Sequence, residues 1–201
     1  IDMIAGPSEI GILADETANT NYLAIDLLSQ AEHDEMASSI MITTSTNIAT
    51  ETSIEVDNYL AKLSRSEIAQ KSIDDRGCII VASSMDEAID LMNDIAPEHL
   101  EVMTVSPFEL LPKIKHAGAI FLGQNTPEPI GDYVAGPNHT LPTGGTAKFY
   151  SPLNVENYMK KSSIISFSQQ AINEIGEQCA LLADTEGLTA HAESVRVRLT
   201  K

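Results

Sequence analysis

The feature that most constrains the fold of this chain is the alternation of short apolar runs with longer amphipathic stretches. The apolar runs, rich in Ile and Val, predict strands at 40–43, 78–81, 100–103, 119–122 and 164–167. The amphipathic stretches between them predict helices at 18–32, 47–63, 85–95 and 107–116. Strands that alternate with helices of this length indicate an α/β layer fold with a mainly parallel sheet and flanking helices.

The first residues fit the same pattern. Ile1 to Ala5 is typical of the end of a buried strand, and Gly6-Pro7-Ser8-Glu9 of the turn that follows it. Ser8 could donate a hydrogen bond to a ligand at that turn. An ordinary turn serine is the alternative.

After Leu122 the alternation stops. Residues 123–150 are rich in Pro and Gly and have no clear period, which predicts a long loop. Because this loop contains Asp132 and His139, we expect it to have a function. Beyond it, two amphipathic stretches, 169–182 and 189–199, predict a small helical appendage. We therefore expect an α/β catalytic domain at 1–150 and a helical C-terminal segment at 151–201, which contacts a partner subunit.

Composition excludes several classes of function. The chain has 29 acidic and 12 basic residues, and its net charge of -17 would repel nucleic acid and anionic membranes. No apolar run is long enough to span a bilayer, and no signal peptide is recognisable. Cys78 and Cys179 have apolar neighbours and no CxxC spacing, which predicts buried free thiols. A cytoplasmic protein is expected.

Two short strings combine histidine with oxygen donors. Gln30 and His33 are three residues apart at the end of a predicted helix, so both side chains can reach one metal ion. Glu98 and His99 are adjacent between a predicted helix and strand, and they offer two bases with different ordinary pKa values. The alternatives are a solvated helix face for the first pair and a turn with a surface carboxylate for the second.

Two further strings have the same character. Asp132 and His139 lie in the long loop, where a carboxylate could bind zinc and an imidazole could contact substrate. Glu186 and His191 lie where a turn enters the last predicted helix. The alternatives are a turn-rich surface loop for the first pair and exposed polar side chains for the second. Together the strings indicate a zinc site or an acid–base site without thiolate ligands.

Taken in order, these strings closely resemble the histidinol dehydrogenase family. The resemblance runs from the first residues almost to the last, and its motifs are 4–9, 29–33, 96–101, 131–143 and 186–191. It implies an incomplete Rossmann-like sheet. It also implies NAD-dependent oxidation of L-histidinol to L-histidine through histidinaldehyde, the last step of histidine biosynthesis.

The resemblance also implies a role for each residue. The zinc ligands would be Gln30, His33, Asp132 and His191, with His191 supplied by the partner subunit of a homodimer. Glu98 and His99 would be the catalytic acid–base pair. Substrate would contact His99 and the zinc ligands, together with Ser8, His139 and Glu186.

Members of this family are longer than this chain, which resembles their C-terminal half. Most NAD contacts would then lie in the other half, and no NAD-binding residue can be named here. Two alternatives remain open. One is a fragment that folds and dimerises without turnover. The other is a zinc hydrolase in which Glu98 activates a metal-bound water.

Overall fold

The apolar runs form a parallel sheet in the computed structural model, which describes residues 3–200. Within these residues, five strands are arranged in the order β3-β2-β1-β4-β5, and every neighbouring pair is parallel. The strands are β1 (Glu9–Ala14), β2 (Ser38–Thr43), β3 (Gly77–Val81), β4 (His99–Met103) and β5 (Ala119–Leu122). The expected α/β fold with a parallel sheet is confirmed.

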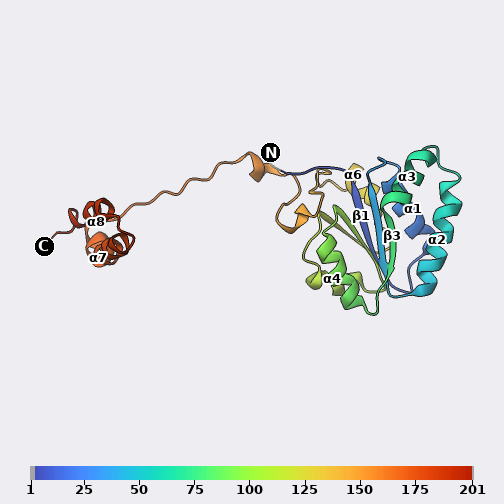
Figure 1. Cartoon of the computed structure of the whole chain (residues 1–201), viewed down its shortest axis with the longest axis horizontal. Helices are drawn as coiled ribbons and strands as arrows, with labels where there is room; N and C mark the ends of the chain where they lie inside the picture. Colours follow the sequence, from blue (N-terminus) through green and yellow to red (C-terminus); the bar gives the residue numbers. More distant parts are fainter. Residues whose placement is uncertain (1–2, 201) are drawn as a thin grey trace. The chain divides into compact units, whose positions relative to one another are not determined.

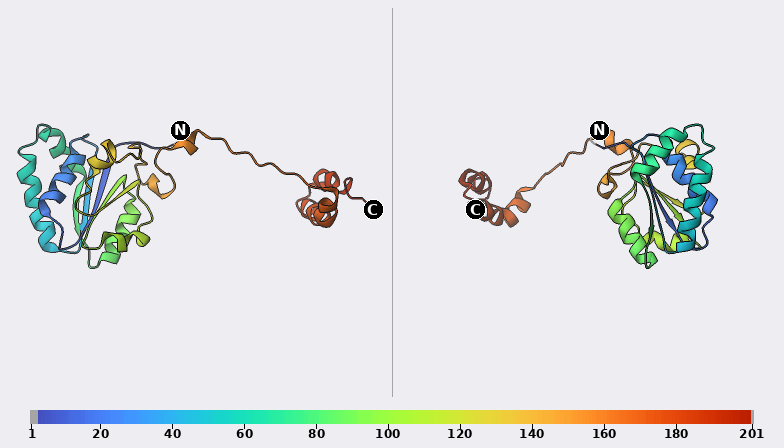
Figure 2. Two further views of the ribbon diagram at one scale, coloured as in Figure 1. Left: turned by 180° about the vertical axis from the view of Figure 1, so that it is seen from behind. Right: turned by 45° about the vertical axis from the view of Figure 1, so that its right-hand side comes forward.

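Helices cover both faces of this sheet (Figures 1 and 2). One face packs against α1 (Thr20–Ala31), α2 (Thr46–Leu60) and α3 (Ser66–Arg76). The other packs against α4 (Met85–Ile95) and Leu110 of α5 (Pro107–Leu110), which the 3-10 turn Leu111–Lys113 follows. Because side chains alternate along a strand, Met103 of β4 packs in the core beneath α1, whereas Leu100 and Val102 pack beneath α4.

Polar caps fix where two of the helices begin. The Asn19 side chain accepts hydrogen bonds from the backbone N–H groups of Asn21 and Tyr22 at the start of α1. The Ser84 hydroxyl accepts one from the Glu87 N–H at the start of α4, at 3.2 Å. These caps satisfy N–H groups that have no partner within their own helix.

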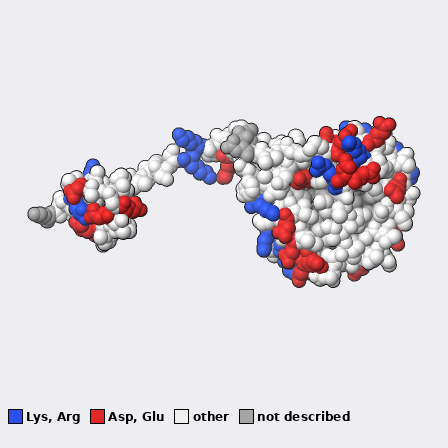
Figure 3. Space-filling model, in the orientation of Figure 1, with Lys and Arg blue, Asp and Glu red and all other residues white. Residues whose placement is uncertain are grey.

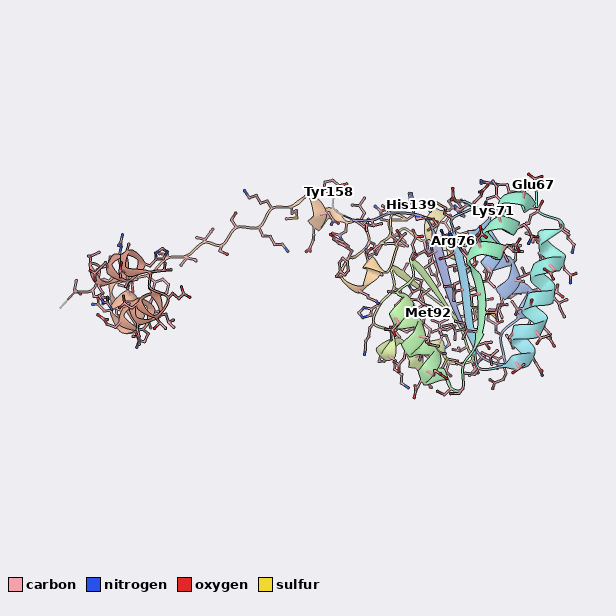
Figure 4. The ribbon with its side chains drawn as sticks, viewed as in Figure 1. Glu67, Lys71, Arg76, Met92, His139 and Tyr158 are labelled. Carbon is pink, nitrogen blue, oxygen red and sulfur yellow. The ribbon has the colours of Figure 1, made fainter. Side chains whose placement is uncertain are left out.

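The first strand begins later than the sequence predicts. Ile1 and Asp2 lie outside the described residues, and Met3 to Ala5 are not in a strand. Ser8 therefore precedes β1 and does not follow a strand. The real strand was missed because Gly11 interrupts its apolar pattern. That glycine leaves room for α4, since a Cβ at Gly11 would lie 2.5 Å from Sδ of Met92 (Figure 4).

Three other expectations need correction. A helix that was not predicted, α3, precedes β3, and the loop at 123–150 contains the helix α6 (Glu128–Tyr133) and the 3-10 turn Thr146–Lys148. The predicted helix at 107–116 is only one turn of α-helix followed by a 3-10 turn. The predicted strand at 164–167 is neither strand nor helix, and Ile164 is 96% exposed. Its β-branched residues favour extended backbone, but no strand pairs with it.

The chain divides into two compact units, Ile1–Tyr158 and Met159–Lys201. The first contains the sheet, and its last element is the 3-10 turn Val155–Tyr158. The second contains α7 (Gln169–Thr185) and α8 (Thr189–Arg196), which pack against each other. The division falls after Tyr158 and not after residue 150. The catalytic and partner-contacting roles assigned to the two parts remain predictions.

Both cysteines and many charged side chains lie at the surface. Cys78 and Cys179 are free thiols, but both are exposed, so the prediction of buried thiols is wrong. Acidic side chains outnumber basic ones, and on the face shown in Figure 3 Lys and Arg lie beside Asp and Glu. None of the helices in residues 3–200 is long and apolar enough to cross a membrane.

We predict that Gly118→Ala destabilises the first unit. A Cβ at Gly118, just before β5, would lie 2.5 Å from the backbone oxygen of Glu98, which cannot move without disturbing the pairing of β4 with β5. The free energy of unfolding should fall by about 1–3 kcal/mol, as for other overpacked sites. Urea unfolding measures this. Lys115→Ala, at an exposed position nearby, should change it by less than about 0.5 kcal/mol.

Candidate functional site

The candidate site lies where β1 and β4 begin. Glu98 immediately precedes β4, His99 is its first residue, and the strand register pairs His99 with Ile10 of β1. The chain enters β4 directly from α4 through Ala96, whose φ of 53° is left-handed and ends the helix. Pro97 then favours extended backbone. This local geometry places the adjacent acid and imidazole between α4 and the amino end of β4, as the sequence predicts.

The backbone of Glu9 determines which nitrogen of His99 carries the proton. His99 Nδ1 lies 3.1 Å from the carbonyl oxygen of Glu9, and because a carbonyl can only accept, Nδ1 donates. Nε2 then keeps a free lone pair, and it is buried with no hydrogen-bond partner among the described residues. Burial is the main cause that lowers the pKa of His99, so the ring is neutral near pH 7. A neutral imidazole with a free Nε2 can accept a proton or bind a metal ion.

The backbone of Glu9 also holds Glu98. Oε2 of Glu98 accepts a hydrogen bond from the Glu9 N–H at 3.0 Å and lies 3.5 Å from Nδ1 of His99. Burial raises the pKa of Glu98 to about 8, and the negative charges of Glu9, Glu128 and Asp132 raise it further against the lowering effect of that hydrogen bond. A carboxyl group with this pKa exchanges its proton close to neutral pH and suits general acid–base chemistry.

Helix α6 brings two more carboxylates to His99. Glu128 and Asp132 are four residues apart and so share one face of the helix. Glu128 Oε1 lies 3.9 Å and Asp132 Oδ1 3.7 Å from Nε2 of His99. Burial, and then the charge of Asp132, raises the pKa of Glu128 to about 7. The ligand atoms of His99, Glu128 and Asp132 all lie within 4.8 Å of one another, a spacing that suits one metal ion.

The position of α6 depends on a glycine. Gly131 faces the ring of Phe121 on β5, and a Cβ there would lie 2.5 Å from that ring. The Phe121 ring is in turn 6.0 Å from the His99 ring, centroid to centroid. The missing side chain at Gly131 thus lets the helix approach close enough for its carboxylates to reach His99.

The end of α1 contributes an unsatisfied amide. Gln30 is 0% exposed, and neither its Oε1 nor its Nε2 has a hydrogen-bond partner among the described residues. A buried amide without partners is costly, and a bound ligand would satisfy it. Its neighbour Ser29 donates to Glu128 Oε2 at 3.4 Å, which places this end of α1 beside α6. His33 follows in the exposed turn. This donor set of amide, imidazole and carboxylate suits zinc.

The other predicted residues are not brought to this cluster by any described contact. Ser8 is half-buried ahead of β1, and His139 is exposed in the segment after α6 (Figure 4). Glu186 and His191 belong to the second unit, where they lie just after α7 and in α8. Their roles remain predictions, as does the four-ligand zinc set.

Two residues of the site, Glu9 and Glu128, are not predicted by the sequence patterns. Glu128 had a recognisable signal, because Pro127-Glu128-Pro129 is typical of a helix start, with proline in the first turn. That start places Glu128 and Asp132 on one helix face. Glu9 had no signal, since it acts through its backbone N–H and carbonyl, which every residue type except proline carries.

The chain is similar to known proteins along nearly its whole length. The family model described as histidinol dehydrogenase matches residues 1–199. The histidinol dehydrogenase of Sulfurimonas denitrificans is 72% identical over 201 residues, which are 100% of this chain and 47% of that protein. That of Wolinella succinogenes is 66% identical over 99% of this chain and 46% of that protein.

A solved structure extends the likeness to the fold. The crystal structure of histidinol dehydrogenase from Elizabethkingia anophelis has a TM-score of 0.91 and 40% sequence identity, and the match covers 98% of this chain and 45% of that one. The chain therefore spans about half the length of the relatives it matches. The matches in sequence and in structure cover almost every residue of the chain, which belongs to the histidinol dehydrogenase family.

Proposed function

We propose that this chain supplies the acid–base and zinc-binding residues for the NAD-dependent oxidation of L-histidinol to L-histidine through histidinaldehyde. The observation that carries the proposal is the buried pair Glu98 and His99, whose ring has a free Nε2 beside Asp132. Family membership supports the reaction, and two bases suit its two oxidations. As a histidine-biosynthetic enzyme it would act in the cytoplasm.

His99 would serve the first oxidation. Its Nε2 is the unprotonated nitrogen, so it can take the hydroxyl proton of histidinol as hydride leaves the carbon. The hydrogen bond from Nδ1 to the Glu9 carbonyl holds the ring in this tautomer. NAD, when bound, accepts the hydride of each oxidation.

Glu98 would serve the second oxidation. An aldehyde must take up water before its carbon can lose another hydride, and the water must lose a proton as it adds. The Glu98 carboxylate can take that proton. It is a stronger base than an ordinary carboxylate, because burial, and then neighbours of like charge, raise its pKa.

Zinc would be held by Gln30, His33 and Asp132 together with His191 of a second copy, so the active form would be a homodimer. Zinc, when bound, would anchor the imidazole and amine of the substrate. The unpartnered Gln30 amide and the carboxylate of Asp132 support such a site. Ser8, His139 and Glu186 would contact the substrate, and most NAD contacts would come from the half of the family's length that this chain lacks.

NADH formation tests the proposal. This chain, fused to the preceding half of the Sulfurimonas denitrificans enzyme, should form two NADH for each histidinol consumed. The chain alone should bind zinc and histidinol without forming NADH. A well-folded, zinc-loaded fusion that forms no NADH would refute the proposal. Amide hydrolysis that needs no NAD would support the zinc hydrolase instead.

We predict that Glu98→Gln in the fusion slows oxidation of added histidinaldehyde by about 10²–10⁴-fold and affects alcohol oxidation less. Since Glu98 is a base only when deprotonated and its pKa is raised to about 8, the aldehyde step should speed up as pH rises through about 8. Stopped-flow absorbance of NADH over pH measures both effects. Equal losses in the two steps, or an unchanged pH profile in the variant, would contradict the assigned role. Glu109→Gln, at an exposed position on α5, is the control.

We predict that Asp132→Asn and His191→Asn each weaken zinc binding by the dimer, because each removes a ligand. Zinc competition with a chromophoric chelator measures the dissociation constant. If His191 acts across the dimer, mixing the His191→Asn fusion with the Asp132→Asn fusion should restore part of the activity, since one mixed site has all its ligands. No recovery in verified mixed dimers would exclude the cross-subunit ligand.

A further inference from the structure

Glu101 is a buried carboxyl group that the proposed chemistry does not use. It lies on β4 two residues after His99, and side chains two apart on a strand point to the same face. It is 1% exposed. Burying a carboxyl group costs free energy unless the group makes compensating contacts, so a glutamate here needs a reason.

Glu101 contacts the start of α6. Its Oε1 accepts a hydrogen bond from the backbone N–H of Glu128, the first residue of that helix, at 2.9 Å. The first N–H groups of a helix lack partners within the helix. Here the preceding residue is Pro127, and α6 has no side-chain cap of its own. Glu101 therefore provides from β4 the cap that the local sequence lacks.

The same helix carries the carboxylates that face His99. The close approach of Gly131 to Phe121 determines how near α6 lies to β5. The hydrogen bond to Glu101 holds the first residue of α6. The two contacts fix the helix at two points. The distances of Glu128 and Asp132 from His99 Nε2, 3.9 Å and 3.7 Å, depend on that placement.

We propose that Glu101 is a positioning residue, whose carboxyl oxygen fixes the start of α6 and thereby holds Asp132 in place for metal binding. This inference rests on the proposed function, in which Asp132 is a zinc ligand. Glu101 itself touches neither metal nor substrate. It acts through the backbone of Glu128.

This role requires an acceptor oxygen at residue 101, because the backbone N–H of Glu128 is the donor. A glutamine side chain has the same length and also presents an oxygen. Leucine has a similar volume but no acceptor. The two substitutions therefore separate the hydrogen bond from packing.

The test compares Glu101→Gln, Glu101→Leu and wild type in this chain. Zinc affinity should be close to wild type in Glu101→Gln and about 10–100-fold weaker in Glu101→Leu, as for other residues that orient metal ligands. Amide hydrogen exchange by NMR should show a protected Glu128 N–H in wild type and Glu101→Gln, and faster exchange of residues 128–133 in Glu101→Leu. Met103→Leu, on the same face of β4, controls for packing and should leave both measurements unchanged.

Unchanged zinc affinity in a folded Glu101→Leu, or equal losses in both Glu101 variants, would overturn the inference. If Glu101→Leu does not fold, wild type and Glu101→Gln still decide, because an unprotected Glu128 N–H in either contradicts the capping role. A wild-type chain that binds no zinc while Glu128 is protected would refute the zinc site and not the capping of α6. The two failures are thus distinguishable.

Discussion

The candidate site depends on the backbone of one residue of β1, Glu9. The N–H of Glu9 donates to Glu98, and the carbonyl of Glu9 accepts from His99. Both groups are therefore oriented by the backbone of the neighbouring strand, and any shift in the pairing of β1 with β4 would move both at once. The parallel register is in turn fixed by the apolar residues that alternate between the two cores, such as Leu100 and Met103.

This arrangement buries several carboxyl groups close together in the protein interior. Glu98, Glu101 and Glu128 are each less than a tenth exposed, and burial is the largest cause of the raised pKa of each. Such groups remain buried by keeping a proton, by accepting backbone N–H donors, or by binding a cation. The carboxyl groups at this site differ in which of these ways they use. Glu98 and Glu101 accept from backbone N–H groups, while Glu128 and Asp132 face the free nitrogen of His99.

Much of the fold and of the candidate site could be predicted from sequence, for physical reasons that differ from residue to residue. β4 and α4 were predicted because their periods are clear, and Glu98 with His99 because neighbours in sequence stay neighbours in space. β1 was misplaced because Gly11, needed for the approach of α4, breaks the apolar pattern. The strand at 164–167 was wrong because strand propensity requires a partner. Glu128 meets His99 only through the packing of α6, which no local pattern encodes.

The site lies at the amino ends of the strands, whereas ligands of doubly wound sheets usually bind beyond the carboxyl ends. In this unit the segments that follow β2 and β3 are therefore remote from Glu98 and His99, at the opposite end of the parallel strands. The short passage from Ala96 to His99, by contrast, joins α4 directly to the site, so a change in its length would displace Glu98 and His99 themselves.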